Sequence, residues 1–113
     1  MVDDDGAVEA FGALAHMDRL AAFRLLVKAG PSGLASGALA EQLAIPPTRM
    51  SFHLATLERS GLLHSWRAGR RVIYAARFEA IRQLLTFLTE DCCGGRPEIC
   101  GELATLADAF SPE

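Results

Sequence analysis

Residues 45–62 read IPPTRMSFHLATLERSGL, and this stretch decides the fold. A proline restricts the residue before it and suits the first turn of a helix, so Pro46 and Pro47 indicate a tight connection followed by a helix. We predict that this helix covers 47–60 and that Gly61 closes it, because glycine readily adopts the left-handed conformation common after a helix end. The stretch therefore indicates a tight turn that leads directly into a helix.

The helix expected over 47–60 has an apolar face and a polar, basic face. At ~100° per residue, Met50, Leu54 and Leu57 fall on the core side. A shorter helix is expected just before it, over 37–44. A short helix, a tight turn and a second helix form a helix-turn-helix, whose second helix enters the major groove of DNA. The residues of the outer face and its flanks, to which we assign DNA reading, are Thr48, Arg49, Ser51, Phe52 and His53.

A basic hairpin is expected directly after the helix-turn-helix. Residues 62–67 and 71–76 read as two strands, and the short connection with Gly69 between them is typical of a β-hairpin. Arg67, Arg70 and Arg71 crowd its tip. A basic hairpin in this position is a wing, which can reach phosphates or the minor groove.

The terminal segments predict amphipathic helices with more apolar surface than a core of this size needs. We expect them over 7–16, 78–90 and about 98–110. The simplest arrangement is a two-fold dimer in which they pack together, which also sets two recognition helices against a palindromic site. The alternative is that they cover only the core of their own protomer. The narrow apolar face of the first helix comprises Val8, Phe11, Leu14 and Ala15.

Two side chains are expected to cap helices. Asp18 precedes a helix over 19–29, and Ser36 precedes the helix over 37–44. The predicted fold is mainly α with a small β-hairpin wing, an α+β winged helix-turn-helix that is homodimeric. We expect a single DNA-binding and dimerisation domain over 1–113.

The charge distribution favours a polyanionic partner, although the net charge of the chain is −3. Residues 45–82 carry seven arginines against two glutamates, whereas residues 83–113 carry one arginine against six acidic residues. A basic middle between acidic ends is the footprint expected of a nucleic-acid-binding element. No apolar run approaches the ~20 residues that span a bilayer, so we expect a cytoplasmic protein with no membrane partner.

All three cysteines lie near the end of the chain, in the segment 89–101. Cys92 and Cys93 are adjacent, and neighbouring cysteines do not easily form an unstrained disulfide with each other. They can ligate one centre, with Cys100 as a third sulfur. Three thiolates without a nearby histidine indicate a soft, all-sulfur site, whereas structural zinc usually takes four ligands. Cys100 is alternatively a small buried hydrophobe.

Three local segments resemble the ArsR/SmtB family of winged-helix repressors. LAHMDRL at 14–20 is similar to the family's "LADPTRL" segment. MSFHLATLERSGL at 50–62 resembles its "VSHHLKVLREAGLV" recognition helix, and RAGRRVIY at 67–74 resembles its "REGRWVYY" wing. The resemblance covers residues 14 to about 90.

The chain also departs from that family. Ala35 and Gly37 stand where many metal-responsive members carry the two thiols of "ELCVCDL", so a sensor in that position is excluded. A histidine-rich zinc site on the last helix is likewise unsupported. Phe52 replaces the first histidine of the recognition motif and can touch a thymine methyl group. For His53 we expect packing or DNA contact, and no metal binding.

The resemblance implies a repressor of an arsenic-resistance operon that binds double-stranded operator DNA as a homodimer. Arsenite-responsive members with C-terminal Cys-Cys and Cys clusters exist in the family. As(III) is thiophilic and three-coordinate, so As(III), or alternatively Sb(III), is the expected inducer at Cys92, Cys93 and Cys100, with no organic cofactor. Two alternatives keep the fold, a thiol redox switch and a two-thiol sensor of methylated arsenite. A cysteine enzyme such as an arsenate reductase is disfavoured because no general base is identifiable, so we expect no enzyme.

Overall fold

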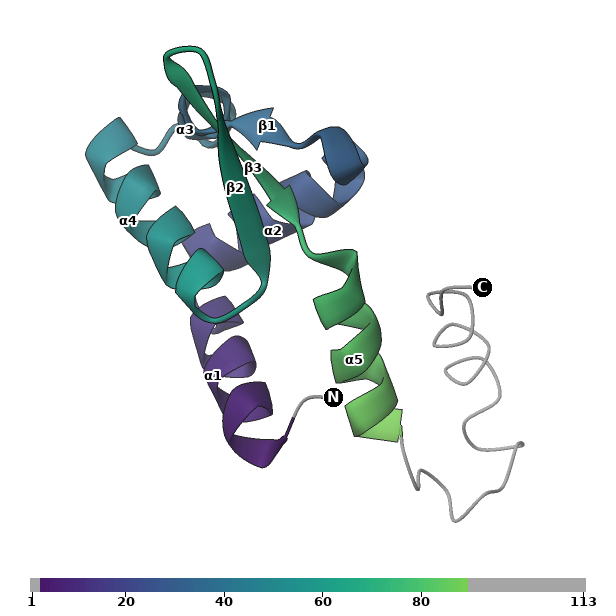
Figure 1. Cartoon of the computed structure of the whole chain (residues 1–113). Helices are drawn as coiled ribbons and strands as arrows, with labels where there is room; N and C mark the ends of the chain where they lie inside the picture. Colours follow the sequence, from purple (N-terminus) through teal and green to yellow (C-terminus); the bar gives the residue numbers. More distant parts are fainter. Residues whose placement is uncertain (1–2, 90–113) are drawn as a thin grey trace.

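The computed structural model describes residues 3–89, which form five α-helices, a short 3₁₀ helix and three strands (Figure 1). The recognition helix expected over 47–60 and the hairpin after it are both present. The elements in chain order are α1 (Asp4–Leu14), α2 (Met17–Ala29), η1 (Gly30–Ser32), β1 (Leu34–Ala35), α3 (Ser36–Leu43), α4 (Pro47–Arg59), β2 (Leu63–Ala68), β3 (Arg71–Ala76) and α5 (Phe78–Thr89). The helix expected at 98–110 and the three cysteines lie outside the described residues.

The strands form one small antiparallel sheet in the order β1-β3-β2. In the hairpin, Leu63 pairs with Ala76 at the base and Ala68 pairs with Arg71 at the tip. β1 adds only two residues on the other edge of β3, where Leu34 lies opposite Tyr74. The sheet therefore joins the wing to the segment between α2 and α3.

The core lies where α2, α3 and α4 meet the sheet. Its largest side chains are almost fully removed from water, and they come from every layer of this unit. They are Leu26, Leu39, Met50, Leu54, Leu57, Leu62 and Leu63. The apolar face expected for the recognition helix is thus confirmed, and it positions the opposite face of α4 outward.

Of the apolar face expected for the first helix, Leu14 packs against the core of the protomer, whereas Val8 and Phe11 do not. α1 buries Ala7, Ala10 and Ala13, whereas Val8 is 71% exposed and Phe11 is also exposed. Both sets of residues recur at helical spacing, so periodicity alone does not choose between them. The alanine face is inside because small side chains let α1 lie close against the body of the domain. Its larger apolar residues are left on the surface.

Both expected helix caps are wrong. His16 is the N-cap of α2, and its Nδ1 accepts a hydrogen bond of 3.1 Å from the backbone N–H of Asp18. Ser36 is the first residue of α3, and Ala35 stands at the N-cap without a side-chain hydrogen bond. The carboxylate of Asp18 therefore does not cap a helix and is available to other side chains.

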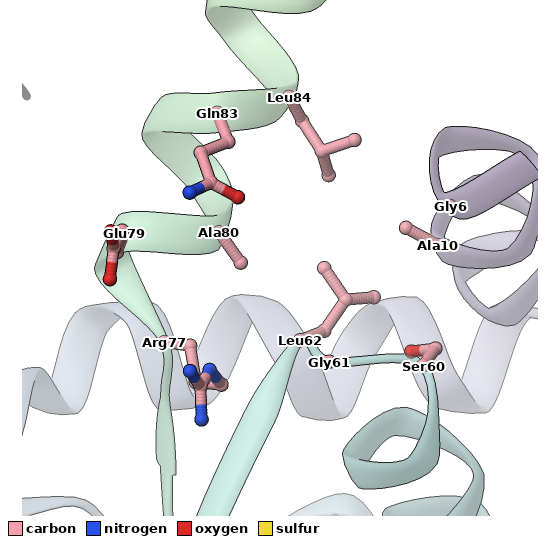
Figure 2. A pocket seen from close by; sticks show the side chains of 10 residues that line it. All are labelled: Gly6, Ala10, Ser60, Gly61, Leu62, Arg77, Glu79, Ala80, Gln83 and Leu84. Atoms are coloured by element: carbon pink, nitrogen blue, oxygen red, sulfur yellow. The ribbon is translucent and has the colours of Figure 1, made fainter. Parts of the chain in front are cut away.

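α5 follows the sheet and, like α1, lies at the opposite end of the domain from the hairpin tip (Figure 1). Between them lies an open cleft of about 250 Å³, walled by both helices and by the turn after α4 (Figure 2). Small and apolar residues of the cleft include Gly6 and Ala10 on α1 and Ala80 and Leu84 on α5. Within residues 3–89, no helix is long and apolar enough to cross a membrane.

Candidate nucleic-acid interface

The outer face of α4 presents side chains suited to the major groove. Thr48, Arg49, Ser51 and Phe52 are all exposed, and Phe52 has 67% of its surface in contact with solvent. Their positions follow from the burial of Met50 on the opposite face, since that fixes the rotation of the helix. These four predicted site residues therefore share one accessible surface near the start of α4.

His53 differs from the other predicted site residues because it is only 5% exposed. Its ring packs against that of His16, with 4.6 Å between the centroids, and its Nε2 lies 3.7 Å from an Asp18 carboxylate oxygen. The expectation that His53 reads DNA is therefore replaced by the packing role. Burial first, and the nearby His16 second, lower the pKa of His53 below its usual 6.5, which favours the neutral ring.

The wing displays its three arginines as the sequence predicts. Arg67, Arg70 and Arg71 are all exposed at the hairpin tip. Gly69 has φ +67 and Arg70 does not have a positive φ, which is the pattern of a two-residue type II′ turn. The tip and the start of α4 lie toward the same end of the domain (Figure 1). The helix and the wing can therefore face one ligand together.

A hydrogen bond between side chains links the wing to the recognition helix. The hydroxyl of Ser65 on β2 donates to Glu58 Oε2 on α4 over 2.7 Å. Glu58 also contributes to a raised pKa of Tyr74 on β3, after the larger effect of burial. This link, which sequence reasoning missed, orients the hairpin against α4. The residue pattern of a strand or of a helix describes only that element. It therefore does not predict a hydrogen bond between a strand residue and a helix residue.

Arg49 has a partner that sequence reasoning also missed. Its Nε lies 4.0 Å from Asp18 Oδ2, and both side chains are partly exposed. Exposed pairs at this distance contribute little to stability, typically about 0–1 kcal/mol. Arg49 can therefore exchange Asp18 for a phosphate or a base edge at small cost. Asp18 lies in the 14–20 motif, and its position there suggests a helix cap, so the sequence does not indicate that it pairs with Arg49.

The predicted thiol site at Cys92, Cys93 and Cys100 lies outside the residues that the structure describes. Thr89, the last described residue, ends α5 three residues before the first of these thiols. The described part of the chain contains no cysteine. The thiol site stays a prediction.

Comparison with known proteins agrees with this geometry. Residues 14–65 match a family model described as a helix-turn-helix domain. No curated protein is detectably similar in sequence. Among solved structures, a homodimeric winged helix-turn-helix DNA-binding domain from Mycobacterium bovis, a possible ArsR-family transcriptional regulator, is 26% identical, with a TM-score of 0.63 over 77% of this chain and 81% of its own.

Two further similar structures belong to named regulators. Reduced HlyU from Vibrio cholerae is 27% identical, with a TM-score of 0.61 over 79% of this chain and 90% of its own. NolR from Sinorhizobium fredii is 27% identical, also with a TM-score of 0.61, over 76% of this chain and 83% of its own. The predicted fold class is confirmed. The chain is a winged helix-turn-helix protein, similar in sequence and fold to transcriptional regulators of the ArsR and HlyU kind.

Proposed function

We propose that the protein is a homodimeric transcriptional repressor that binds operator DNA with α4 in the major groove and the wing on the backbone or in the minor groove. The observation that carries this proposal is the shared surface of α4 and the wing. It combines exposed Arg49, Ser51 and Phe52 with the hairpin arginines at one end of the domain. Arginine suits both guanine edges and phosphates, and a thymine methyl group suits Phe52.

The homodimer is supported by apolar residues that the protomer leaves uncovered. Val8 and Phe11 on α1 and Leu88 on α5 are exposed, and both helices lie at the end of the domain away from the wing tip (Figure 1). The cleft between α1 and α5 adds a hollow of small residues to the same end (Figure 2). The similar domain from M. bovis is homodimeric. A two-fold pair joined through this end presents two copies of α4 to a palindromic operator.

The first prediction concerns the wing. An Arg70→Ala, Arg71→Ala double variant should lose on the order of 5- to 150-fold in operator affinity, because two hydrogen bonds at a net ~0.5–1.5 kcal/mol each amount to ~1–3 kcal/mol, and ~1.4 kcal/mol is tenfold. Each lost phosphate contact also makes the negative slope of log affinity against log salt shallower by ~0.9. Fluorescence anisotropy at several salt concentrations measures both quantities.

Arg82→Ala is the matched control for this experiment. Arg82 carries the same charge on α5, at the other end of the domain, where it pairs with Glu79 at 3.5 Å. It should leave affinity and salt slope close to those of the unmodified protein. The wing variant removes two positive charges and Arg82→Ala removes one. An equal loss per charge removed would therefore mean that net charge, and no contact by the wing, drives binding.

We further propose that the regulated genes confer arsenic resistance and that As(III), or Sb(III), is the inducer at Cys92, Cys93 and Cys100. The thiol count and the departure at Ala35 and Gly37 support this assignment. The thiols follow α5 in the chain, so an ion bound there has a short path to the helices assigned to dimerisation. Coupling of this kind typically amounts to ~1–3 kcal/mol.

The second prediction is that arsenite lowers the operator affinity of the reduced protein by about 5- to 150-fold, the range that such coupling corresponds to. A Cys92→Ser, Cys93→Ser double variant should bind the operator normally and no longer respond. Cys100→Ser separates a three-thiol site from a two-thiol sensor of methylated arsenite. Release by peroxide without arsenite would instead support a redox switch, and unchanged release of the double variant by arsenite would reject the thiol assignment.

A further inference from the structure

A cluster of His16, Asp18 and His53 lies where the start of α2 meets the inner flank of α4. Each residue offers one atom that can bind a metal ion, and these atoms all lie within 4.8 Å of one another. His16 and Asp18 come from the N-terminus of α2, and His53 comes from the recognition helix. Within residues 3–89 this is the one group of at least three such side chains.

His53 carries the strongest indication that a ligand is missing from this cluster. It is 95% buried, and neither of its ring nitrogens has a hydrogen-bond partner among the described residues. A buried polar group without a partner typically costs ~1–3 kcal/mol. An apolar residue at this position would avoid that cost. Its Nε2 lies 3.7 Å from an Asp18 carboxylate oxygen, a distance too long for a hydrogen bond.

We propose that His16, Asp18 and His53 bind a divalent transition metal ion, with Zn(II) as the best match. Two imidazoles and one carboxylate form a nitrogen and oxygen ligand set that Zn(II) accepts, with a water molecule in the fourth position. The three ligand atoms must come closer together to bind one ion. The side chains of His16 and Asp18 are fully and partly exposed, so they can move toward His53. The site shares no residue with the proposed thiol sensor.

Metal binding would rearrange two existing contacts. A neutral imidazole has one lone pair, so His16 cannot both accept the Asp18 N–H and bind a metal ion. The metal bond would therefore replace this helix cap. Asp18 would also exchange its weak contact with Arg49 for the ion, which releases Arg49 on the outer face of α4. An ion at this position would thus join α2 to the recognition helix.

The test must separate this site from the cysteines, which also bind soft metals. The test uses the untagged chain in which Cys92, Cys93 and Cys100 are all replaced by serine. We expect one Co(II) or Zn(II) per protomer by titration calorimetry. Bound Co(II) should show the visible absorption of a four-coordinate nitrogen and oxygen site. No binding by this chain, or binding with unchanged affinity after both substitutions below, would overturn the proposal.

Two substitutions locate the ion. Asp18→Asn preserves shape but removes the one charged ligand, so it should weaken metal binding by at least about tenfold, since even changes to outer-shell partners cost ~10–100-fold. His53→Leu should abolish binding at the same concentrations while the chain stays folded, because leucine suits a buried position. Circular dichroism confirms folding in each case. Arg82→Ala, which lies on α5, should bind the ion as the parent does.

Discussion

Replacing Gly33 by alanine should destabilise the domain by about 2–6 kcal/mol, from ~1–3 kcal/mol of backbone strain and ~1–3 kcal/mol of overpacking. Gly33 has φ +67 and ψ −165, a region that is essentially restricted to glycine. A Cβ atom built there would lie 2.1 Å from the carbonyl oxygen of Tyr74. This oxygen belongs to the backbone of β3, so it cannot rotate away. Urea denaturation followed by circular dichroism measures the loss, which is a large part of a typical stability of ~5–15 kcal/mol.

Gly30→Ala is the matched control, because Gly30 has nearly the same backbone conformation at φ +80 and ψ −166. A Cβ atom at Gly30 would meet nothing within 4 Å. This variant should therefore show only the backbone part of the loss, about 1–3 kcal/mol. The difference between the two variants measures the close approach of Gly33 to β3. Equal losses would contradict the steric argument, since strain alone would then explain both.

The importance of Gly33 could not be predicted from the sequence. The residues after Gly33 form the two-residue strand β1, which is too short to show an alternating pattern in the sequence. The constraint itself comes from Tyr74, which is far away in the chain and pairs with Leu34 in the sheet. Turn composition predicts where glycine occurs, but a close contact between distant segments depends on how the strands pair.

Local patterns predicted the parts of the interface that depend on one element only. The outer face of α4 follows from the burial of Leu54 and Leu57, and the exposed wing arginines follow from a two-residue hairpin. The misassignments concern residues whose environment depends on a second element. His53 lies on the flank of α4, and its burial depends on His16 at the start of α2. Helical periodicity carries no information about that neighbour.

The first helix shows the same limit in its packing. Val8 and Phe11 form the more hydrophobic stripe, so transfer free energy alone would place them inside. Ala7 and Ala10 are inside because the space beside α1 suits small side chains. The consequence is functional, since the larger residues stay available to a second protomer. The exposed face of α1 thus supplies part of the surface on which the proposed dimer depends.

Replacing Leu54 by alanine should destabilise the domain by about 2–5 kcal/mol, the usual result of removing a buried leucine side chain. Leu54 is fully buried on α4, on the same face as Met50 and Leu57. The residues assigned to DNA contact lie on other faces of that helix and are not altered. We therefore expect a lower denaturation midpoint and, at a temperature where the variant is folded, an operator affinity within a few-fold of the unmodified protein. Calorimetry and anisotropy on the same sample measure the two effects.

Leu20→Ala supplies the matched control, because it makes the same chemical change at a position on α2 that is 44% exposed. The side chain of Leu20 buries less apolar surface than that of Leu54, so we expect its removal to destabilise the domain by at most about 1 kcal/mol. Both variants must be compared at one protomer concentration, since the stability of a dimer depends on concentration. Equal destabilisation of the two variants would contradict the assigned core. Loss of operator binding by fully folded Leu54→Ala would show that the inner face of α4 controls the orientation of the outer one, so that core packing and DNA reading are coupled through the rotation of this helix.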